Sequence, residues 1–244
     1  MVNTVPSENG NFLFFKGFLN IKSGITTRKF GDCNSYYLPL CKNPAAEKKC
    51  TAIAKLTGNN FFHRMIPRHN DGICFASNSN ENCDYSCDAL ALYKGKGKAG
   101  NLLLAPTGDC PMVIIECERG FGIIHSGYKC ARLNIAVKTI GRFISFFSAE
   151  SENIKAIIWP GIRGDCYEVG PEFIDYFGTE NVYWLNGSFR IDLAKLIKKQ
   201  MISAGMLAHN IAIVKKYCSF CNNDLFFSAR RGDKERNLIF AHTP

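Results

Sequence analysis

Short apolar runs bounded by turn-forming residues recur along the chain, and most have the length of a β-strand. Runs rich in β-branched and aromatic residues indicate strands, whereas polar and glycine-rich stretches indicate loops. The pattern predicts loops at 77–86 and 94–100. It predicts strands at 12–19, 21–27, 61–66, 72–76, 88–93, 111–115, 121–124, 154–159 and 211–214.

Longer segments with helical spacing and end signals predict helices at 45–56, 130–147, 169–177 and 193–204. Asn43 and Pro44 begin the first of these, whereas Asp192 caps the last and Gly205 ends it. Strands outnumber helices without a regular strand-helix-strand alternation, and neither repeats nor a linker-like change in composition divides the chain. We therefore predict an α+β fold, a single domain over residues 1–244 with a mixed β-sheet core and flanking helices.

The predicted strands 111–115 and 121–124 are joined by turn residues, which favours a hairpin. Cys110 enters the first strand and His125 leaves the second. Antiparallel strands bring these two ends side by side, so the thiol and the imidazole can come within bonding reach. Such a pair suits a nucleophile with its base, or two ligands of one metal ion. A buried cysteine and a satisfied core histidine would give the same pattern without any function.

Other polar residues are candidates for the same site. Asp109 adds a carboxylate directly before the cysteine. His69, in a polar turn, is better placed to reach the site than His63, which lies among aromatic residues in a predicted strand. Adjacent Arg230 and Arg231 face opposite ways if the segment is extended, so one can point into a pocket and bind phosphate or carboxylate. A surface cluster of ion pairs is the alternative for these arginines.

The segment Cys218-Ser219-Phe220-Cys221 is a CxxC motif, which by itself is a weak signal. A zinc ribbon needs a second cysteine pair at matching spacing, and each other cysteine has another explanation. A redox role needs a helix N-terminus after the first cysteine, and Asn222-Asn223 disfavours one.

Composition limits the classes of partner. The net charge of +9 and pI near 9.0 favour anionic partners, but lysine and arginine are dispersed and no nucleic-acid-binding motif follows. We therefore predict a solvated basic surface that attracts phosphate-bearing small molecules, with no nucleic-acid partner. Apolar stretches stay shorter than a membrane span, so no membrane partner is expected. Twelve scattered cysteines without an export signal predict reduced thiols in a cytoplasmic protein, whose oligomeric state stays open.

Five short motifs, in this order along the chain, resemble those of the YfiH family, also called the polyphenol oxidase, laccase-domain or peptidoglycan editing factor family. The resemblance covers the chain from about His69 to Arg236. The motifs are Pro67-Arg68-His69-Asn70, Thr107-Gly108-Asp109-Cys110, His125-Ser126-Gly127-Tyr128-Lys129, Cys166-Tyr167-Glu168-Val169-Gly170 and Phe227-Ser228-Ala229-Arg230-Arg231.

The resemblance implies a metal site on His69, Cys110 and His125, usually holding zinc, with copper possible under the family's older label. It also implies a fold similar to YfiH proteins and to the catalytic domains of cytotoxic necrotizing factors. The implied substrates are purine nucleosides and phosphate. The implied reactions are phosphorolysis of adenosine, inosine and methylthioadenosine, as in a purine nucleoside phosphorylase, and deamination of adenosine, as in an adenosine deaminase.

The chain departs from the family motifs at several positions. Tyr128-Lys129 stands where the family has Trp-Arg, and Lys129 keeps the charge but loses the planar fork of arginine. Asn70 replaces a glycine and Gly108 an alanine. We expect Arg231, helped by Lys129 or Arg230, to bind phosphate, and Asp109 to orient a ligand or relay a proton.

Three other functions fit the same residues. Cys110 and His125 can form a metal-free thiol dyad that acts on amides. A copper phenol oxidase is a second alternative, although one site with two histidines and a cysteine falls short of a multicopper cluster. A binding module stabilised by a metal, without catalysis, is the third.

Overall fold

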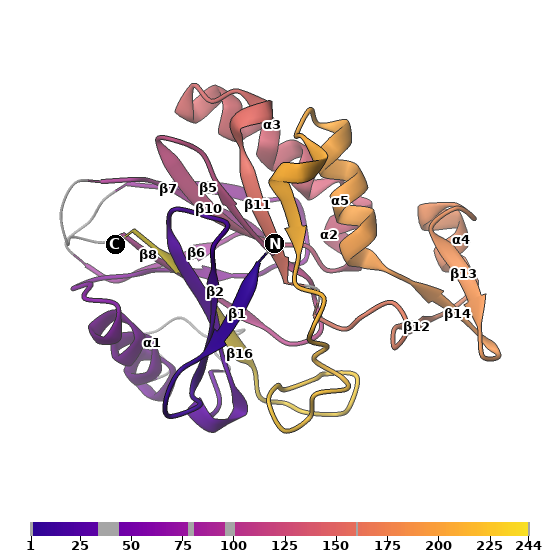
Figure 1. The fold of residues 1–244 in the computed structure, drawn as a ribbon, viewed down its shortest axis with the longest axis horizontal. Coiled ribbons are helices and arrows are strands. Elements are labelled where there is room, and N and C mark those ends of the chain that lie inside the picture. The colour runs from indigo at the N-terminus through magenta and orange to yellow at the C-terminus, as the bar shows by residue number, and fades with distance from the viewer. Residues whose placement is uncertain (1, 34–43, 78–80, 96–100, 160, 244) are drawn as a thin grey trace.

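The computed structural model describes residues 2–33, 44–77, 81–95, 101–159 and 161–243. In this part of the chain, two mixed sheets are stacked face to face, and helices cover the outer face of each (Figure 1). The predicted mixed core with flanking helices is confirmed, although it is built from two stacked sheets. The predicted cap Asn43 and the glycine-rich stretch 96–100 lie outside the described residues.

The first sheet combines strands from the two ends of the chain. In order across the sheet, its strands are β1 (Asn3–Pro6), β2 (Phe12–Lys16), β3 (Lys22–Thr26), β16 (Asn237–His242), β8 (Leu102–Thr107), β4 (His63–Ile66) and β6 (Cys83–Ser86). Strand β16 pairs antiparallel with both β3 and β8, whereas β8, β4 and β6 run parallel to one another. The C-terminal strand therefore joins the N-terminal hairpins to the middle of the chain.

The second sheet is built around the predicted central hairpin. In order, its strands are β15 (Ile211–Ile213), β11 (Lys155–Trp159), β9 (Met112–Glu116), β10 (Gly120–His125), β7 (Ala89–Tyr93) and β5 (Ile73–Ala76). Strands β9 and β10 pair antiparallel, with His125 opposite Met112, and antiparallel β11 and β7 flank them. The hairpin is confirmed, and it occupies the centre of its sheet.

Side-chain alternation lets a central strand contribute to two cores at once. In β8, Leu102 and Leu104 pack on the helical side of the first sheet, whereas Leu103 and Ala105 face the second sheet. Because successive side chains of a strand point to opposite faces, a strand buried on both faces reads as a continuous apolar run. The core between the sheets therefore contains residues from both of them.

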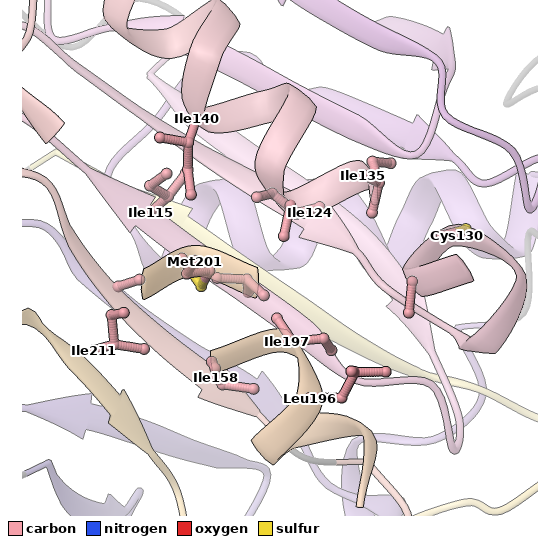
Figure 2. Packing of buried hydrophobic residues seen from close by; sticks show 14 of the residues in the cluster. Ile115, Ile124, Cys130, Ile135, Ile140, Ile158, Leu196, Ile197, Met201 and Ile211 are labelled. Atoms are coloured by element: carbon pink, nitrogen blue, oxygen red, sulfur yellow. The ribbon is translucent and has the colours of Figure 1, made fainter. Parts of the chain in front are cut away.

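Helices complete the outer layers. Helix α1 (Pro44–Leu56) packs on the first sheet, and α2 (Tyr128–Arg132), α3 (Ile135–Phe147) and α5 (Leu193–Ser203) pack on the second. Figure 2 shows the isoleucine-rich contact between the second sheet and its helices. Short 3-10 helices span Arg28–Phe30, Ser151–Asn153 and Ala208–Asn210. Among the described residues, the helices are all too short or too polar to cross a bilayer.

The predicted helix 130–147 is wrong in one respect, because the structure divides it into α2 and α3. Asn134 adopts a left-handed conformation with φ 56° at the junction. Its backbone N–H donates to the Ala131 carbonyl, and Gln200 of α5 donates to the same carbonyl and to the Asn134 side chain. These contacts from a distant helix stabilise a break that apolar spacing alone does not reveal.

A small third sheet projects from one end of the sandwich together with α4 (Glu172–Phe177) (Figure 1). Its strands, in order, are β12 (Glu168–Val169), β14 (Ser188–Ile191) and β13 (Val182–Leu185). The sequence pattern missed β1, β6, β8, β12, β13, β14 and β16. Of these, β6 lies within the stretch that was predicted to be a loop at 77–86.

Candidate functional site

Cys110 and His125 lie side by side, as the hairpin predicts. Cys110 precedes β9, and His125 is the last residue of β10, where its ring is 1% exposed. The Ser126 N–H donates to the Pro111 carbonyl at 2.9 Å, which holds the two strand ends together beyond the ladder. Both side chains therefore emerge from the same end of the second sheet.

His69 joins this pair from a different segment. Its ring meets the ring of His125 edge to face, with centroids 5.1 Å apart. The candidate ligand atoms of His69, Cys110 and His125 all lie within 4.8 Å of one another. His63 is fully buried elsewhere, with its Nδ1 atom 3.2 Å from the Tyr85 hydroxyl. The structure thus places His69, and not His63, beside the cysteine.

Three chain crossings between the stacked sheets supply this site. The chain passes from the first sheet to the second between β4 and β5, between β6 and β7, and between β8 and β9. The first crossing contains His69, the second contains Asp88 and the third contains Cys110. His125 lies against all three, at the end of the neighbouring strand β10.

Asp88 is a buried carboxylate that the sequence reasoning missed. It accepts hydrogen bonds from the backbone N–H groups of Arg68 (3.1 Å), His69 (3.0 Å) and Asn70 (2.9 Å), and from His125 Nδ1 (2.8 Å). Burial alone would raise its pKa, but the His125 hydrogen bond and the backbone donors hold it below its usual range. An ionised carboxylate only accepts hydrogen bonds, so His125 carries its proton on Nδ1 and presents Nε2 to the site.

The same carboxylate fixes the backbone of His69. This residue has φ 60°, a left-handed conformation that is uncommon for a side chain of its size. Asp88 binds its N–H and those of both neighbours, which stabilises the turn and aims the ring at His125. A strained residue held in this way is typical of a functional site.

The surroundings of the three side chains fit a metal ion. His125 Nε2 is buried and has no hydrogen-bond partner among the described residues. A Cβ atom at Gly127 would lie 2.7 Å from Cys110 Sγ and 3.5 Å from His125 Nε2, so glycine keeps this space open. Two imidazoles and a thiolate from separate segments are a suitable ligand set for zinc and leave a fourth position for a reactant. The residues present therefore fit the group that the resemblance implies.

The charges in the site favour a thiolate. Burial alone would raise the pKa of Cys110, but the charge and close approach of His125, and of His69, lower it to about 6. Burial acts to lower the pKa of His125, but the thiolate and the Asp88 hydrogen bond raise it well above its usual value. A thiolate at neutral pH is the form that binds a metal or attacks an electrophile.

A cavity of about 380 Å³ opens beside these residues. Tyr128 of α2, Phe173 of α4 and Tyr167 line it, and Arg230 closes one side. The Arg230 guanidinium lies 5.1 Å from the centre of the Tyr167 ring. Tyr128 directly follows Gly127, which packs on Cys110, and burial and the nearby Cys110 charge raise the pKa of Tyr167, so this wall of the cavity lies near Cys110.

The other predicted site residues have different positions. Asp109 accepts hydrogen bonds from the Ser219 hydroxyl and the Arg230 N–H, both at 2.6 Å, and so holds two loops against the site. Both terminal nitrogens of Arg231 donate to backbone carbonyls or to Asp233. These contacts occupy the N–H groups with which Arg231 was expected to bind phosphate. Arg230, in contrast, lines the cavity. Lys129 is exposed on α2.

Several proteins of known sequence are similar to this chain. It is 31% identical over 135 residues to a protein named adenosine deaminase RL5 from an unknown prokaryotic organism, and spans 51% of that protein's length. It is 25% identical over 190 residues to a purine nucleoside phosphorylase of Aquifex aeolicus, covering 78% of this chain and 86% of the relative. The relatives are thus named for reactions of purine nucleosides.

Solved structures and a family model complete the comparison. The protein YfiH of Bacillus licheniformis has a TM-score of 0.79 at 19% identity, covering 96% of this chain and 97% of that one. YlmD of Geobacillus stearothermophilus has a TM-score of 0.78 at 17% identity, covering 97% of each chain. A family model described as multi-copper polyphenol oxidoreductase laccase matches residues 44–238. The chain therefore belongs to this laccase-like family, which includes the YfiH proteins.

Proposed function

We propose that this protein is a zinc-dependent purine nucleoside enzyme. Its reactions would be phosphorolysis of adenosine, inosine or methylthioadenosine, and deamination of adenosine. The observation that supports this most directly is the convergence of His69, Cys110 and His125 beside a cavity lined by aromatic residues and Arg230. The names of the relatives favour the same class of substrate.

Zinc is the metal that this ligand set suits best. His69, Cys110 and His125 provide two imidazoles and one thiolate, which leaves one position open as a catalytic zinc site requires. When bound, zinc supplies a Lewis acid that lowers the pKa of a coordinated water towards about 7. Copper binds similar ligands, but reduction of oxygen to water needs a cluster of several copper ions. Among the described residues, this is the candidate metal group that contains two histidines.

The cavity beside the site suits a purine and an anion. The rings of Tyr128, Tyr167 and Phe173 offer flat apolar surfaces on which a purine base can stack. Arg230 is exposed at the cavity and carries the planar donor geometry that binds phosphate oxygens. We therefore assign phosphate binding to Arg230, helped by Lys129, in place of Arg231.

Two carboxylates position these groups without contacting substrate. Asp88 holds the His125 ring with Nε2 towards the site and fixes the turn that carries His69. Asp109 binds the N–H of Arg230 and so places the phosphate-binding side chain at the cavity. The buried end of the site thus fixes the ligands, and the exposed end binds the substrate.

A metal-free thiol enzyme is the second candidate, because one observation favours it specifically. The pKa of Cys110 is lowered to about 6 by His125 and His69, so a thiolate and an imidazolium can form without a metal. Such a pair could attack an amide or ester carbonyl. A metal-free pair of Cys110 and His125 gives no role to His69, which lies beside both of them.

The test is metal analysis of the purified protein, followed by a screen of purine nucleosides with and without phosphate. We expect zinc bound at the site, turnover that a chelator abolishes, and loss of both in Cys110→Ala. Cys83→Ala, a half-buried cysteine in β6, is the matched control and should retain zinc and turnover.

Three other results would refute the proposal or support one of the alternatives. A Cys110→Ala protein that keeps its zinc and full nucleoside turnover would refute the proposal. Turnover that survives chelation but is lost on thiol alkylation would instead support the thiol enzyme. Unfolding on chelation, with no turnover of any nucleoside, would support a binding module.

A further inference from the structure

Three other cysteines converge at a second position, away from Cys110. Cys166 lies in the loop after β11, and Cys218 and Cys221 lie in the segment after β15. The three Sγ atoms are all within 4.8 Å of one another, and those of Cys166 and Cys221 are 3.0 Å apart. Cys218 is buried, Cys166 is half-buried and Cys221 is exposed, so the cluster has one side open to solvent.

Both segments are folded into turns that direct the sulfur atoms together. The Cys218 N–H donates to the Asn222 side chain at 2.9 Å, and the Asn222 N–H donates to the Cys218 carbonyl at 3.0 Å. In the other loop, the Cys166 N–H donates to the Arg163 carbonyl at 2.9 Å. The Arg163 N–H donates to Cys218 Sγ at 3.4 Å, which links the two turns.

This arrangement supplies what the CxxC motif lacks in the sequence. Two cysteines separated by two residues form one half of a typical zinc site, and Cys166 adds a third sulfur from a loop 55 positions before Cys221. Three thiolates held this close together repel one another unless a cation lies between them. Thiolates are the ligands that select soft or borderline cations such as Zn²⁺.

We propose that Cys166, Cys218 and Cys221 bind a second zinc ion, with a solvent molecule as the fourth ligand. Binding displaces the thiol protons and forms three zinc–sulfur bonds. The site is independent of the candidate ligands His69, Cys110 and His125, with which it shares no residue. It is also independent of whether the protein acts on nucleosides.

The role of this zinc ion is structural, because it joins two loops that frame the cavity. Tyr167, which follows Cys166, lines the cavity. Ser219, which follows Cys218, donates its hydroxyl to Asp109. Arg231 binds the carbonyl groups of Ser219 and Phe220. Joining the loops therefore fixes the wall of the cavity and the segment that carries Arg230.

A disulfide between Cys166 and Cys221 is the competing use of the same sulfur atoms. It would leave Cys218 without a role, although a backbone N–H is directed at its sulfur. Zinc accounts for all three sulfur atoms and the disulfide for two.

The test is zinc stoichiometry on protein purified with zinc and without a chelator. We expect about two zinc ions per chain in the wild type, and about one in Cys221→Ser, Cys218→Ser and Cys166→Ser as well as in Cys110→Ala. Cys83→Ser is the control and should keep both. Cobalt substitution gives an independent readout, because sulfur-to-cobalt charge-transfer absorbance at the second site should persist in Cys110→Ala and fall in Cys221→Ser.

The exposed Cys221 keeps the test valid even if the buried Cys218 variant does not fold. A wild-type zinc content that is unchanged by Cys221→Ser would overturn the proposal. A Cys166–Cys221 disulfide in freshly purified protein, detected by mass and thiol titration, would also overturn it. Loss of catalysis by Cys110→Ala with retention of one zinc ion would leave the second site supported.

Discussion

Asp88→Asn is the substitution that tests the organisation of the site most directly. The change keeps the shape of the side chain but replaces one acceptor oxygen by an NH2 group, which only donates. If the amide nitrogen replaces Oδ2, the N–H groups of Arg68 and Asn70 lose their acceptor. If it replaces Oδ1, His69 N–H, His125 Nδ1 and the Cys130 thiol lose theirs. At least two donors are left unpaired in either orientation.

The expected magnitude follows from that count. An unpaired buried donor costs about 1–3 kcal/mol, so two cost about 2–4 kcal/mol after partial hydration of the exposed turn. Loss of a carboxylate that orients a ligating histidine typically costs about 10- to 100-fold in metal affinity or activity. We therefore expect Asp88→Asn to lower both the free energy of unfolding and the zinc affinity.

The assays are urea unfolding of the chelated protein, zinc affinity by competition with a chromophoric chelator, and kcat/KM for the best nucleoside. Asp71→Asn is the matched control, because Asp71 lies in the crossing that carries His69 but is exposed and paired with Lys138 at the surface. It should behave as the wild type. Asp88→Asn protein with unchanged stability and zinc affinity would refute the assignment of Asp88 as the residue that orients His125.

Three further predictions test the space, the charges and the loops around the site. Gly127→Ala places a methyl group against Cys110 Sγ, so it should lower the zinc content and cost about 1–3 kcal/mol of stability in thermal unfolding. Gly141→Ala in α3 is the control, because open space surrounds it and the change should not destabilise the protein. Equal behaviour of the two variants would contradict the close contact between Gly127 and Cys110. Arg230→Ala should raise the KM for phosphate with little change in stability. Arg231→Ala should show the opposite pattern, a loss of stability with little change in this KM, because it removes hydrogen bonds to three backbone carbonyls. An unchanged KM for phosphate in Arg230→Ala would contradict the proposed role of Arg230. Burial alone would raise the pKa of Asp233, but hydrogen bonds, including that from Arg231, lower it to about 2. The Asp233 carboxylate therefore stabilises the fold above its unfolded pKa of about 4, and this contribution is lost as the pH falls towards 2. After allowance for solvent screening we expect about 1 kcal/mol, seen as a smaller loss of stability in acid for Asp233→Asn, and a pH profile parallel to the wild type would exclude it.

Local sequence signals predicted the parts of the fold that local interactions determine. The hairpin that carries Cys110 and His125 depends on two apolar runs and the turn between them, and the ends of its strands were predicted to within one residue. The cap of α5 is equally local, because Asp192 accepts a hydrogen bond from the Lys195 N–H at 3.0 Å. Such features depend on residues a few positions apart, so a single sequence is sufficient to reveal them.

The features that were missed depend on distant contacts. Asp88 looks like an ordinary residue before an apolar strand, and its role appears only when the turn at 68–70 and His125 pack around it. Arg231 was expected to bind phosphate, but the carbonyls that it binds come from a loop whose path the sequence does not show. Cys166 gave no signal as a partner of the CxxC motif for the same reason.

The crossings between the two sheets have a consequence for evolution and design. Because His69, Asp88 and Cys110 lie where the chain passes between the sheets, a small slide of one sheet over the other would displace them relative to His125. Core residues between the sheets, such as Leu103 and Ile239, therefore limit how accurately the site is assembled. Repacking that interior would damage the chemistry before it unfolds the protein, so mutational tolerance there should be lower than thermal stability alone indicates.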